Sequence, residues 1–501
     1  MNPQHPYNSL VERSREVALL GSVGSLLGWD QETHLPVAGG DYRAAQLSHL
    51  SALAHSRWVA DEVGGWLDAC EDGGGAAEPA AAANLREWRR SYDRARKLPQ
   101  RLVEELSRQC SLGQQAWQKA RADREFAQFA PHLWRIVELT REVREHVGYA
   151  VQPYGALLDE YEHGLDGATL SSLFETLAPR LAELARRGEE RSRASPTRLP
   201  DGPYPQAGQA AFNREVATAF GFDFSAGRID TSAHPFCTTL GARDTRMTTR
   251  YDERDFTNSL YCVLHETGHA LYEQGLDPEA FGTPLGSASS LGVHESQSRL
   301  WENHVGRSPA FWERWLPRAA SFFPQLAGIT PGQLTEHVNR CRRSFIRVDA
   351  DELTYDMHII LRFRIERAIV NDRLPVAEIP ALWNQTFREL FDLEVPDDAS
   401  GCLQDVHWSH GAFGYFPTYT LGNLNAAQLV QAARRSLPGL DDALARGDYA
   451  PLRDWLRESV HQHGQRHQPQ ALIKLASGAA TAADAHLARL EALADAGGGA
   501  P

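Results

Sequence analysis

The sequence lacks the features that mark secreted and membrane-embedded proteins. Its six cysteines are scattered singly through 501 residues without a C-x-x-C pair, so they form no disulfide framework and are expected to be reduced thiols. No apolar stretch approaches the length that a membrane span needs. The N-terminus has no basic start followed by an apolar run, so no signal peptide is expected. These absences predict a cytoplasmic protein with no membrane partner.

Positively charged residues are fewer than negatively charged ones. The chain has 51 Lys and Arg against 65 Asp and Glu, which gives a net charge of −14. A surface of this sign repels nucleic-acid phosphates and anionic lipid, so no nucleic-acid partner is expected. The charge balance does not select a substrate.

The chain shows no fixed-period repeat. Its length alone suggests about three domains, but length is only a rough guide to domain number. A hydrophobic fraction of 42% and twelve tryptophans are enough for one large core. We therefore expect a single domain over residues 1–501, with a Gly/Ala-rich loop insertion at about 73–83 and a flexible tail at about 490–501.

Most of the chain has the apolar spacing of amphipathic helices. Thr, Ile, Arg and Asp alternate between Gly227 and Tyr251, and Thr245 to Arg250 is typical of a strand. The fold class is therefore mainly α, with one small β-sheet. The helical stretches include residues 9–58 with a break at Leu35–Pro36, residues 102–147 with a break near Ala130–Pro131, and residues 170–194.

A His-Glu-x-x-His motif lies in the middle of the chain, inside a helix-periodic segment. His265 and His269 are four residues apart, so they share one helical face and can point at one metal ion. Glu266 lies beside them, where it can reach a metal-bound water without being a ligand. Asp255 is a start signal and Gly275 a stop, which predicts a helix of about five turns. The pattern indicates a zinc peptidase; the alternative is a surface helix with two solvated histidines.

A catalytic zinc site needs three protein ligands and an open position. Glu295 follows His269 by 26 residues, on the next expected helix, and completes a His, His, Glu set. The alternative for Glu295 is an ordinary surface carboxylate. On a helix His294 points about 100° away from Glu295, so it is a weaker ligand candidate. It can instead contact a metal ligand and orient it.

Six motifs follow one another in an order that resembles the Taq-type thermostable metallocarboxypeptidase family. Together with a Leu26-x-x-Trp29-Asp30 segment near the start, they extend the resemblance over essentially the whole chain. The motifs are His234-Pro235-Phe236, Asp244-Thr245-Arg246-Met247-Thr248, His265-Glu266-Thr267-Gly268-His269, His294-Glu295-Ser296-Gln297, Ile346-Arg347-Val348-Asp349-Ala350-Asp351, and Gly401-Cys402-Leu403-Gln404-Asp405-Val406-His407-Trp408.

The resemblance implies a zinc-dependent carboxypeptidase that removes C-terminal amino acids of broad specificity from peptides by metal-activated water attack. Members of the family are mostly helical, two-lobed domains with a deep central groove, and they are commonly homodimers. His265, His269 and Glu295 would hold one Zn²⁺ per chain, with Co²⁺ as an alternative ion. Glu266 would be the general base.

Two further roles have candidates in the same motifs. His407 and Tyr419, in the glycine-rich segment from Gly401 to Leu421 that we expect to be a cleft loop, are candidates for stabilising the oxyanion. Tyr415 competes with Tyr419, and core packing is the alternative for all three.

A carboxypeptidase must recognise a free carboxylate, which the planar fork of arginine can bind in bidentate fashion. Arg347 is the first candidate and Arg246 the second; the alternative for both is a surface position or a structural ion pair. His234 is expected to shape the wall of the groove. The candidates for orienting the metal-binding histidines or the arginines are Asp349, Asp351 and Asp405.

Two other functions compete with this prediction. A zinc oligoendopeptidase would use the same ligands, and only its indifference to an amidated peptide C-terminus would distinguish it. A helical binding scaffold without catalysis is the second, and Glu266 argues against it because a non-catalytic metal site needs no base there.

Overall fold

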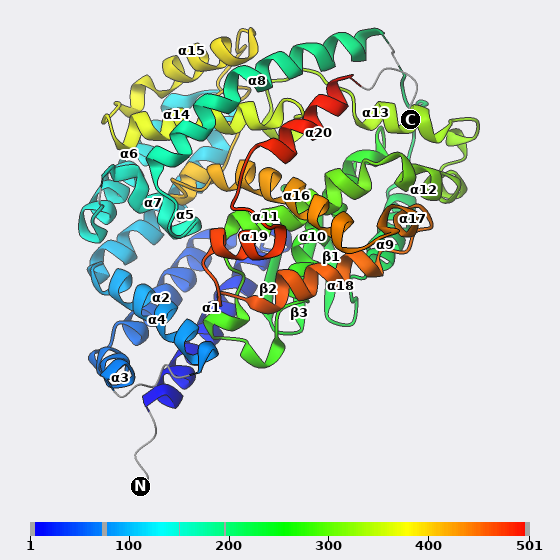
Figure 1. The fold of residues 1–501 in the computed structure, drawn as a ribbon. Helices are drawn as coiled ribbons and strands as arrows, with labels where there is room; N and C mark the ends of the chain where they lie inside the picture. The colour runs from blue at the N-terminus through cyan, green and yellow to red at the C-terminus, as the bar shows by residue number, and fades with distance from the viewer. Residues whose placement is uncertain (1–5, 73–77, 150, 195–196, 496–501) are drawn as a thin grey trace.

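The computed structural model describes residues 6–72, 78–149, 151–194 and 197–495 (Figure 1). Within them the chain forms twenty α-helices and three β-strands, so the expected mainly α class with one small sheet is confirmed. None of the described helices combines the length and apolar character that a membrane span requires.

Nine helices precede the sheet in the described part of the chain. They are α1 (Pro6–Thr33), α2 (Gly40–Trp58), α3 (Asp61–Asp72), α4 (Pro79–Arg96), α5 (Gln100–Asp123), α6 (Phe126–Val147), α7 (Pro153–Tyr161), α8 (Gly167–Ala194) and α9 (Gln206–Phe220).

Eleven helices follow the sheet in the described residues. They are α10 (Phe256–Glu273), α11 (Leu291–Arg299), α12 (Pro309–Phe322), α13 (Pro331–Val338), α14 (Tyr355–Val370), α15 (Ile379–Phe391), α16 (Pro417–Ser436), α17 (Leu440–Ala445), α18 (Ala450–Ser459), α19 (Pro469–Ser477) and α20 (Asp484–Asp495).

Three expected boundaries are wrong. Helix α6 continues through Pro131, its sixth residue: the proline removes one intrahelical hydrogen bond, and burial of Phe129 and Leu133 on either side of it outweighs that loss. Residues 79–83 of the expected loop insertion begin α4, since Pro79 suits the first helical position and alanine is a strong helix former; residues 73–77 lie outside the described part. Of the expected flexible tail, residues 490–495 are helical and Leu490 is fully buried, while 496–501 also lie outside it.

The sheet has the strand order β1-β3-β2, formed by Gly227–Thr231, Asp244–Thr249 and Cys237–Gly241 respectively. Strand β1 is parallel to β3, and β2 is antiparallel to it. Met247 of β3 is buried against Val263 and Ala270 of α10. The sheet therefore fixes the position of α10 from one side.

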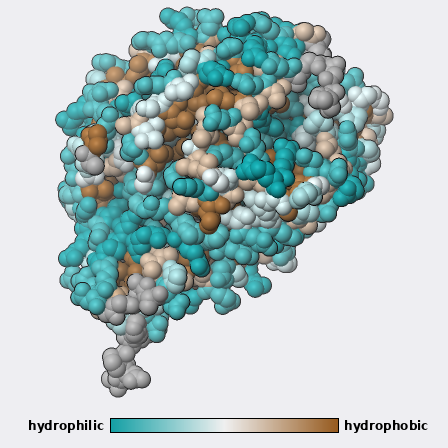
Figure 2. Space-filling view, viewed as in Figure 1, coloured by the Kyte–Doolittle hydropathy of each residue, from teal (hydrophilic) through white to brown (hydrophobic). Residues whose placement is uncertain are grey.

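Two large hydrophobic clusters lie on either side of α16. The first gathers side chains from α5 to α8, α14, α15 and α20, and includes Leu421 of α16. The second gathers side chains from α9 to α13 and α17 to α19, and includes Leu429 of α16. Helices α10, α11 and α16 lie together at the centre of the molecule (Figure 1), and the visible surface is mostly hydrophilic (Figure 2).

Two glycines allow these central helices to approach closely. A Cβ atom on Gly268 of α10 would lie 2.5 Å from the carbonyl oxygen of Gln297 and the Cα of Ser298, both in α11. A Cβ on Gly422 of α16 would lie 2.4 Å from Cγ of Glu295. No side chain fits at such distances, so glycine sets the spacing of α10, α11 and α16.

We expect Gly268→Ala to lower the free energy of unfolding by about 1–3 kcal/mol, because the added methyl group meets backbone atoms that cannot rotate away. Gly24→Ala in α1 is the matched control: its Cβ has no neighbour within 4 Å, and alanine favours a helix by about 1 kcal/mol over glycine. Urea denaturation of both variants checks the contrast. Equal stability in the two variants would contradict the close-approach argument.

Candidate metal centre

Helix α10 presents two histidines on a partly exposed face. Its start is the expected one, since the Asp255 side chain accepts a hydrogen bond from the backbone N–H of Thr257. The helix ends at Glu273, just before Gly275. The side chains of His265 and His269 retain 19% and 16% exposure, so small molecules can reach them. The opposite face is apolar and buried, through Phe256, Leu260, Leu264 and Leu271.

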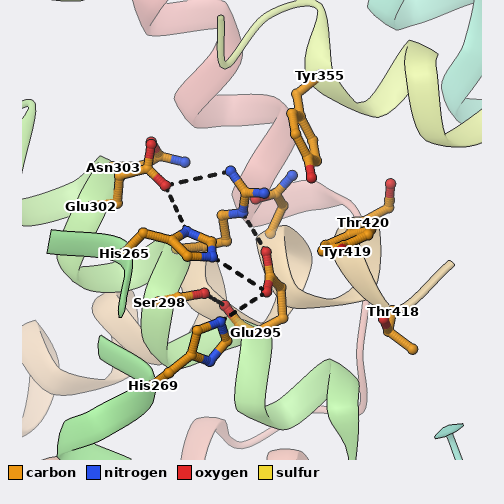
Figure 3. Close-up of polar contacts among 12 residues, drawn as sticks. His265, His269, Glu295, Ser298, Glu302, Asn303, Tyr355, Thr418, Tyr419 and Thr420 are labelled. Atoms are coloured by element: carbon orange, nitrogen blue, oxygen red, sulfur yellow. Dashed lines mark hydrogen bonds and ion pairs between the residues drawn. The ribbon is translucent and has the colours of Figure 1, made fainter. Parts of the chain in front are cut away.

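Glu295 of α11 meets both histidines. Its Oε2 lies 3.3 Å from Nε2 of His269 and 3.8 Å from Nε2 of His265 (Figure 3). One ion with ligand bonds of about 2.0–2.2 Å in tetrahedral geometry separates its ligand atoms by about 3.3–3.6 Å. In the described residues these three side chains are the only group of three or more His, Cys, Asp or Glu whose ligand atoms come this close. The arrangement fits a single divalent cation.

The charge of Glu295 also fits a metal ligand. Arg299 donates from Nε to Oε1 of Glu295 over 2.6 Å, which leaves Oε2 facing the histidines. Burial disfavours ionisation, but the charges of Arg299 and the histidines outweigh it and hold the pKa of Glu295 well below its ordinary value. Glu295 is therefore an anion whose Oε2 faces both histidines.

Glu266 is buried beside this group. Burial raises its pKa to about 7; neighbouring His265 opposes the shift, and the negative charges of Glu295 and Glu302 add to it. A carboxyl group whose pKa lies near neutrality can accept a proton and return it. This is the property that a general base needs.

The remaining ring nitrogen of each histidine has a partner. Nδ1 of His265 lies 2.9 Å from Oε2 of Glu302, and Nδ1 of His269 lies 2.5 Å from Nδ1 of His294. Nε2 of His294 lies 2.8 Å from Oε1 of Glu273. The sequence offered His294 as a weaker ligand candidate or a supporting residue, and its contact with His269 favours the second role; Glu302 and Glu273 were not predicted. The signal for Glu302 was its spacing, two helical turns after Glu295.

Two of the three aspartates proposed for orienting roles have other partners. Asp349 pairs with Arg250 at 3.4 Å, and Asp351 accepts hydrogen bonds from the backbone N–H groups of Arg342 and Leu353. Their described contacts include none with the two metal-site histidines or with the two candidate arginines. Asp405, in contrast, contacts one of those arginines, as the second of the two predicted roles requires.

Asp405 lies between two buried arginines. Its carboxylate accepts from Nε of Arg347 over 2.9 Å and from Nε of Arg362 over 2.6 Å. Arg347 also donates from Nη1 to the hydroxyl of Tyr355 over 2.8 Å. Burial opposes the ionisation of Asp405, but the two guanidinium groups outweigh it and lower its pKa far below the ordinary value. One carboxylate for two arginines leaves an excess positive charge.

His407 and Tyr419 form a pair beside these arginines. Nε2 of His407 lies 3.0 Å from the hydroxyl of Tyr419, and Arg347 lies 4.8 Å from the Tyr419 ring. Burial, and next the charge of Arg347, lower the pKa of His407 to about 3, so its ring is neutral. In Figure 3, Tyr355 and Tyr419 lie beyond Glu295 on the side away from His265.

The segment around these residues differs from the expected cleft loop. Pro417 begins α16, so Tyr419 lies on a helix and only the residues before it are irregular or 3₁₀-helical. The loop prediction is wrong from Pro417 onward because proline at the first helical position favours a helix start. The Tyr415 ring lies 5.2 Å from His407, so both tyrosines are neighbours of the histidine.

Arg246 and His234 lie in other contacts. Arg246 pairs with Asp244 at 2.8 Å and stacks 4.5 Å from the ring of Trp29, which links α1 to the sheet. His234 lies near Arg121, at 3.4 Å, and near the Trp117 ring. Their described contacts include none with His265, His269 or Glu295.

Comparison with known proteins gives a consistent result. A model of the carboxypeptidase Taq (M32) metallopeptidase family matches residues 9–493. The sequence is 42% identical to thermostable carboxypeptidase 1 of Thermus thermophilus over 98% of both chains, and 36% identical to carboxypeptidase 1 of Bacillus subtilis over 91% of both.

Solved structures of similar proteins superpose along the whole chain. The M32 carboxypeptidase of Deinococcus radiodurans has a TM-score of 0.90 at 37% identity, covering 98% of this chain and 100% of its own. Metallocarboxypeptidase 1 of Trypanosoma cruzi has a TM-score of 0.92 at 36% identity, covering 98% and 99%.

We expect Asp405→Ala to cost about 3–5 kcal/mol of unfolding free energy, because it leaves two buried guanidinium groups without a counter-charge. Asp349→Ala is the control: it removes an aspartate whose side chain is 54% exposed, and an exposed pair contributes about 1 kcal/mol or less. Urea denaturation measures both. A loss below about 1 kcal/mol in the Asp405 variant would show that the buried pairs do not stabilise the fold.

Proposed function

The chain belongs to the carboxypeptidase Taq (M32) metallopeptidase family and is a metallocarboxypeptidase; we propose that it removes C-terminal amino acids of broad specificity from peptides, with Glu266 as general base. The observation that carries this proposal is the convergence of His265, His269 and the ionised Glu295 beside a buried glutamate. The family implies a divalent metal, and we propose one Zn²⁺ per chain, with Co²⁺ as an alternative ion.

The bound cation would supply Lewis acidity, which polarises the scissile carbonyl and eases deprotonation of water. The carboxylate of Glu266 would take that proton as the water oxygen attacks the carbonyl carbon. The same carboxyl group would then give the proton to the departing amine nitrogen. Without a metal, burial raises the pKa of Glu266 to about 7; a nearby cation would lower that pKa and favour the carboxylate form, which takes the first proton.

We propose that His407 and Tyr419 stabilise the oxyanion of the tetrahedral intermediate. The hydroxyl of Tyr419 is a hydrogen-bond donor that the fold already holds in place, and its contact with the neutral His407 ring fixes its direction. Tyr415 is the alternative donor, since it borders the same histidine.

We propose that Arg347 binds the peptide's terminal carboxylate. Asp405 and Tyr355 engage Nε and Nη1 of its guanidinium group, and the shared aspartate leaves the local charge positive. Arg246 is the second candidate, although Asp244 and Trp29 already hold it. His234 would border the peptide farther from the metal.

We also propose a cytoplasmic homodimer that binds peptides and no nucleic acid. All six cysteines are free, as a reducing compartment requires. Leu19, Val23 and Leu26 of α1 are 61%, 47% and 40% exposed and share one helical face, which a second copy could cover. Sedimentation of the purified protein tests the dimer.

A zinc oligoendopeptidase remains the alternative, and a pair of peptides separates the two functions. We expect a peptide with a free C-terminus to lose residues one at a time, while the same peptide with a C-terminal amide stays intact, because Arg347 needs a carboxylate. Mass spectrometry follows both digestions, and an N-acetylated peptide serves as the control that should be cleaved normally. Internal cleavage of the amidated peptide would establish the endopeptidase instead.

Variants of the two site glutamates should separate catalysis from metal binding. We expect Glu266→Gln to retain stoichiometric metal and lose about a thousandfold in kcat, because the base is gone and the ligands are intact. Glu295→Ala should lose the metal on dialysis. Elemental analysis and peptide kinetics measure both; near-normal turnover in the first variant, or retained zinc in the second, would refute the assigned role.

A further inference from the structure

Nδ1 of each metal-site histidine is linked to a glutamate, directly for His265 and through one more residue for His269. We propose that Glu302 and Glu273 are positioning residues that fix the proton and the direction of the two rings: Glu302 acts on His265 directly, and Glu273 acts on His269 through His294. This inference rests on the proposed function, because it assumes that both histidines bind the metal.

The contact of Glu302 determines which nitrogen of His265 faces the metal. An ionised carboxylate can only accept hydrogen bonds, so the 2.9 Å contact to Oε2 requires the proton of His265 to lie on Nδ1. The lone pair of Nε2 then faces Oε2 of Glu295 and the metal position. A carboxylate partner also makes the ring a stronger ligand.

The environment of Glu302 keeps it ionised. Arg307 donates from Nη2 to its Oε1 over 3.1 Å, and Arg299 lies 3.5 Å from its Oε2. These two guanidinium groups supply the counter-charge that a buried carboxylate needs, so Glu302 can accept hydrogen bonds on both oxygens. Arg299 holds both Glu295 and Glu302, since the three residues are spaced four and three positions apart along one helical face.

Glu273 fixes the proton of His269 in the same way, but through the intervening ring of His294. Oε1 of Glu273 accepts from Nε2 of His294 over 2.8 Å, which places a proton of His294 on Nε2. A metal-binding Nε2 of His269 carries no proton, so the proton of that ring lies on Nδ1 and is donated to Nδ1 of His294, at 2.5 Å. The lone pair on Nε2 of His269 is left facing Glu295.

A purely structural role is the competing explanation, because Glu302 also neutralises two buried arginines. A structural role predicts a less stable protein whose folded form binds zinc normally. A positioning role predicts weaker zinc binding and a changed histidine proton in protein that is still folded. The affinity of the apoprotein for Zn²⁺ and the state of the ring protons therefore distinguish the two roles.

The test compares Glu302→Gln and Glu273→Gln with the wild type. Zn²⁺ affinity is measured by competition with a chromophoric chelator, and the ring N–H protons are observed as shifted, exchangeable proton NMR signals of the Co²⁺-loaded protein. We expect Glu302→Gln to weaken Zn²⁺ binding by about 10–100-fold and Glu273→Gln by about tenfold, with one N–H signal lost or exchanging faster in each variant.

Glu189→Gln is the matched control, because Glu189 is also a largely buried, arginine-paired carboxylate, with Arg343 at 2.8 Å, in the distant helix α8. It should change the affinity less than about twofold. Wild-type affinity and unchanged N–H signals in both site variants would overturn the inference. If Glu302→Gln does not fold, Glu273→Gln decides, since its side chain is more exposed. Failure of the wild type itself to bind Zn²⁺ would instead refute the proposed function.

Discussion

The close packing of α11 between α10 and α16 is the constraint on which the site depends. Glu295 reaches the two histidines only because Gly268 and Gly422 let the three helices approach without side chains between them. A methyl group at either position would push Glu295 away by more than the tolerance of a metal–ligand bond, which is a few tenths of an ångström. The relative positions of His265, His269 and Glu295 are therefore set by backbone spacing, and the two hydrophobic clusters maintain that spacing.

The charges around this packing form two regions of opposite sign. Near the metal position, the carboxyl groups of Glu266, Glu273, Glu295 and Glu302 outnumber Arg299 and Arg307, and a divalent cation would balance the excess. Around Asp405, two arginines share one carboxylate, and an anion would balance that excess. Buried charges need such compensation. Under the proposed function, a cation in the first region and a peptide carboxylate in the second would supply it, so one fold could hold both a metal and a chain terminus.

The sequence predicts whatever depends on local spacing. The face shared by His265 and His269, the helix start at Asp255 and the strand that contains Arg246 follow from periods of 3.6 and 2 residues. Pairings across the fold follow no such period: Glu273 reaches His269 only through a residue of the next helix, and Asp405 meets Arg362 from 43 positions away. Local rules also mislead where tertiary packing outweighs them, as at Pro131, which lies inside α6 between the buried side chains of Phe129 and Leu133.

The helix after Glu295 shows how distant chain segments contribute to the metal centre. Leu300 to Gly306 form a π-helical turn, a geometry that interrupts the regular hydrogen-bond ladder and is frequent at functional sites. The backbone carbonyl of Asn303, beside Glu302, accepts a hydrogen bond from Nη2 of Arg489 over 2.7 Å. Arg489 belongs to α20, almost two hundred positions along the chain, and it also pairs with Glu352. The last described helix thus stabilises the turn that carries Glu302, the residue in contact with His265, so the candidate metal centre depends on contacts from distant parts of the described chain.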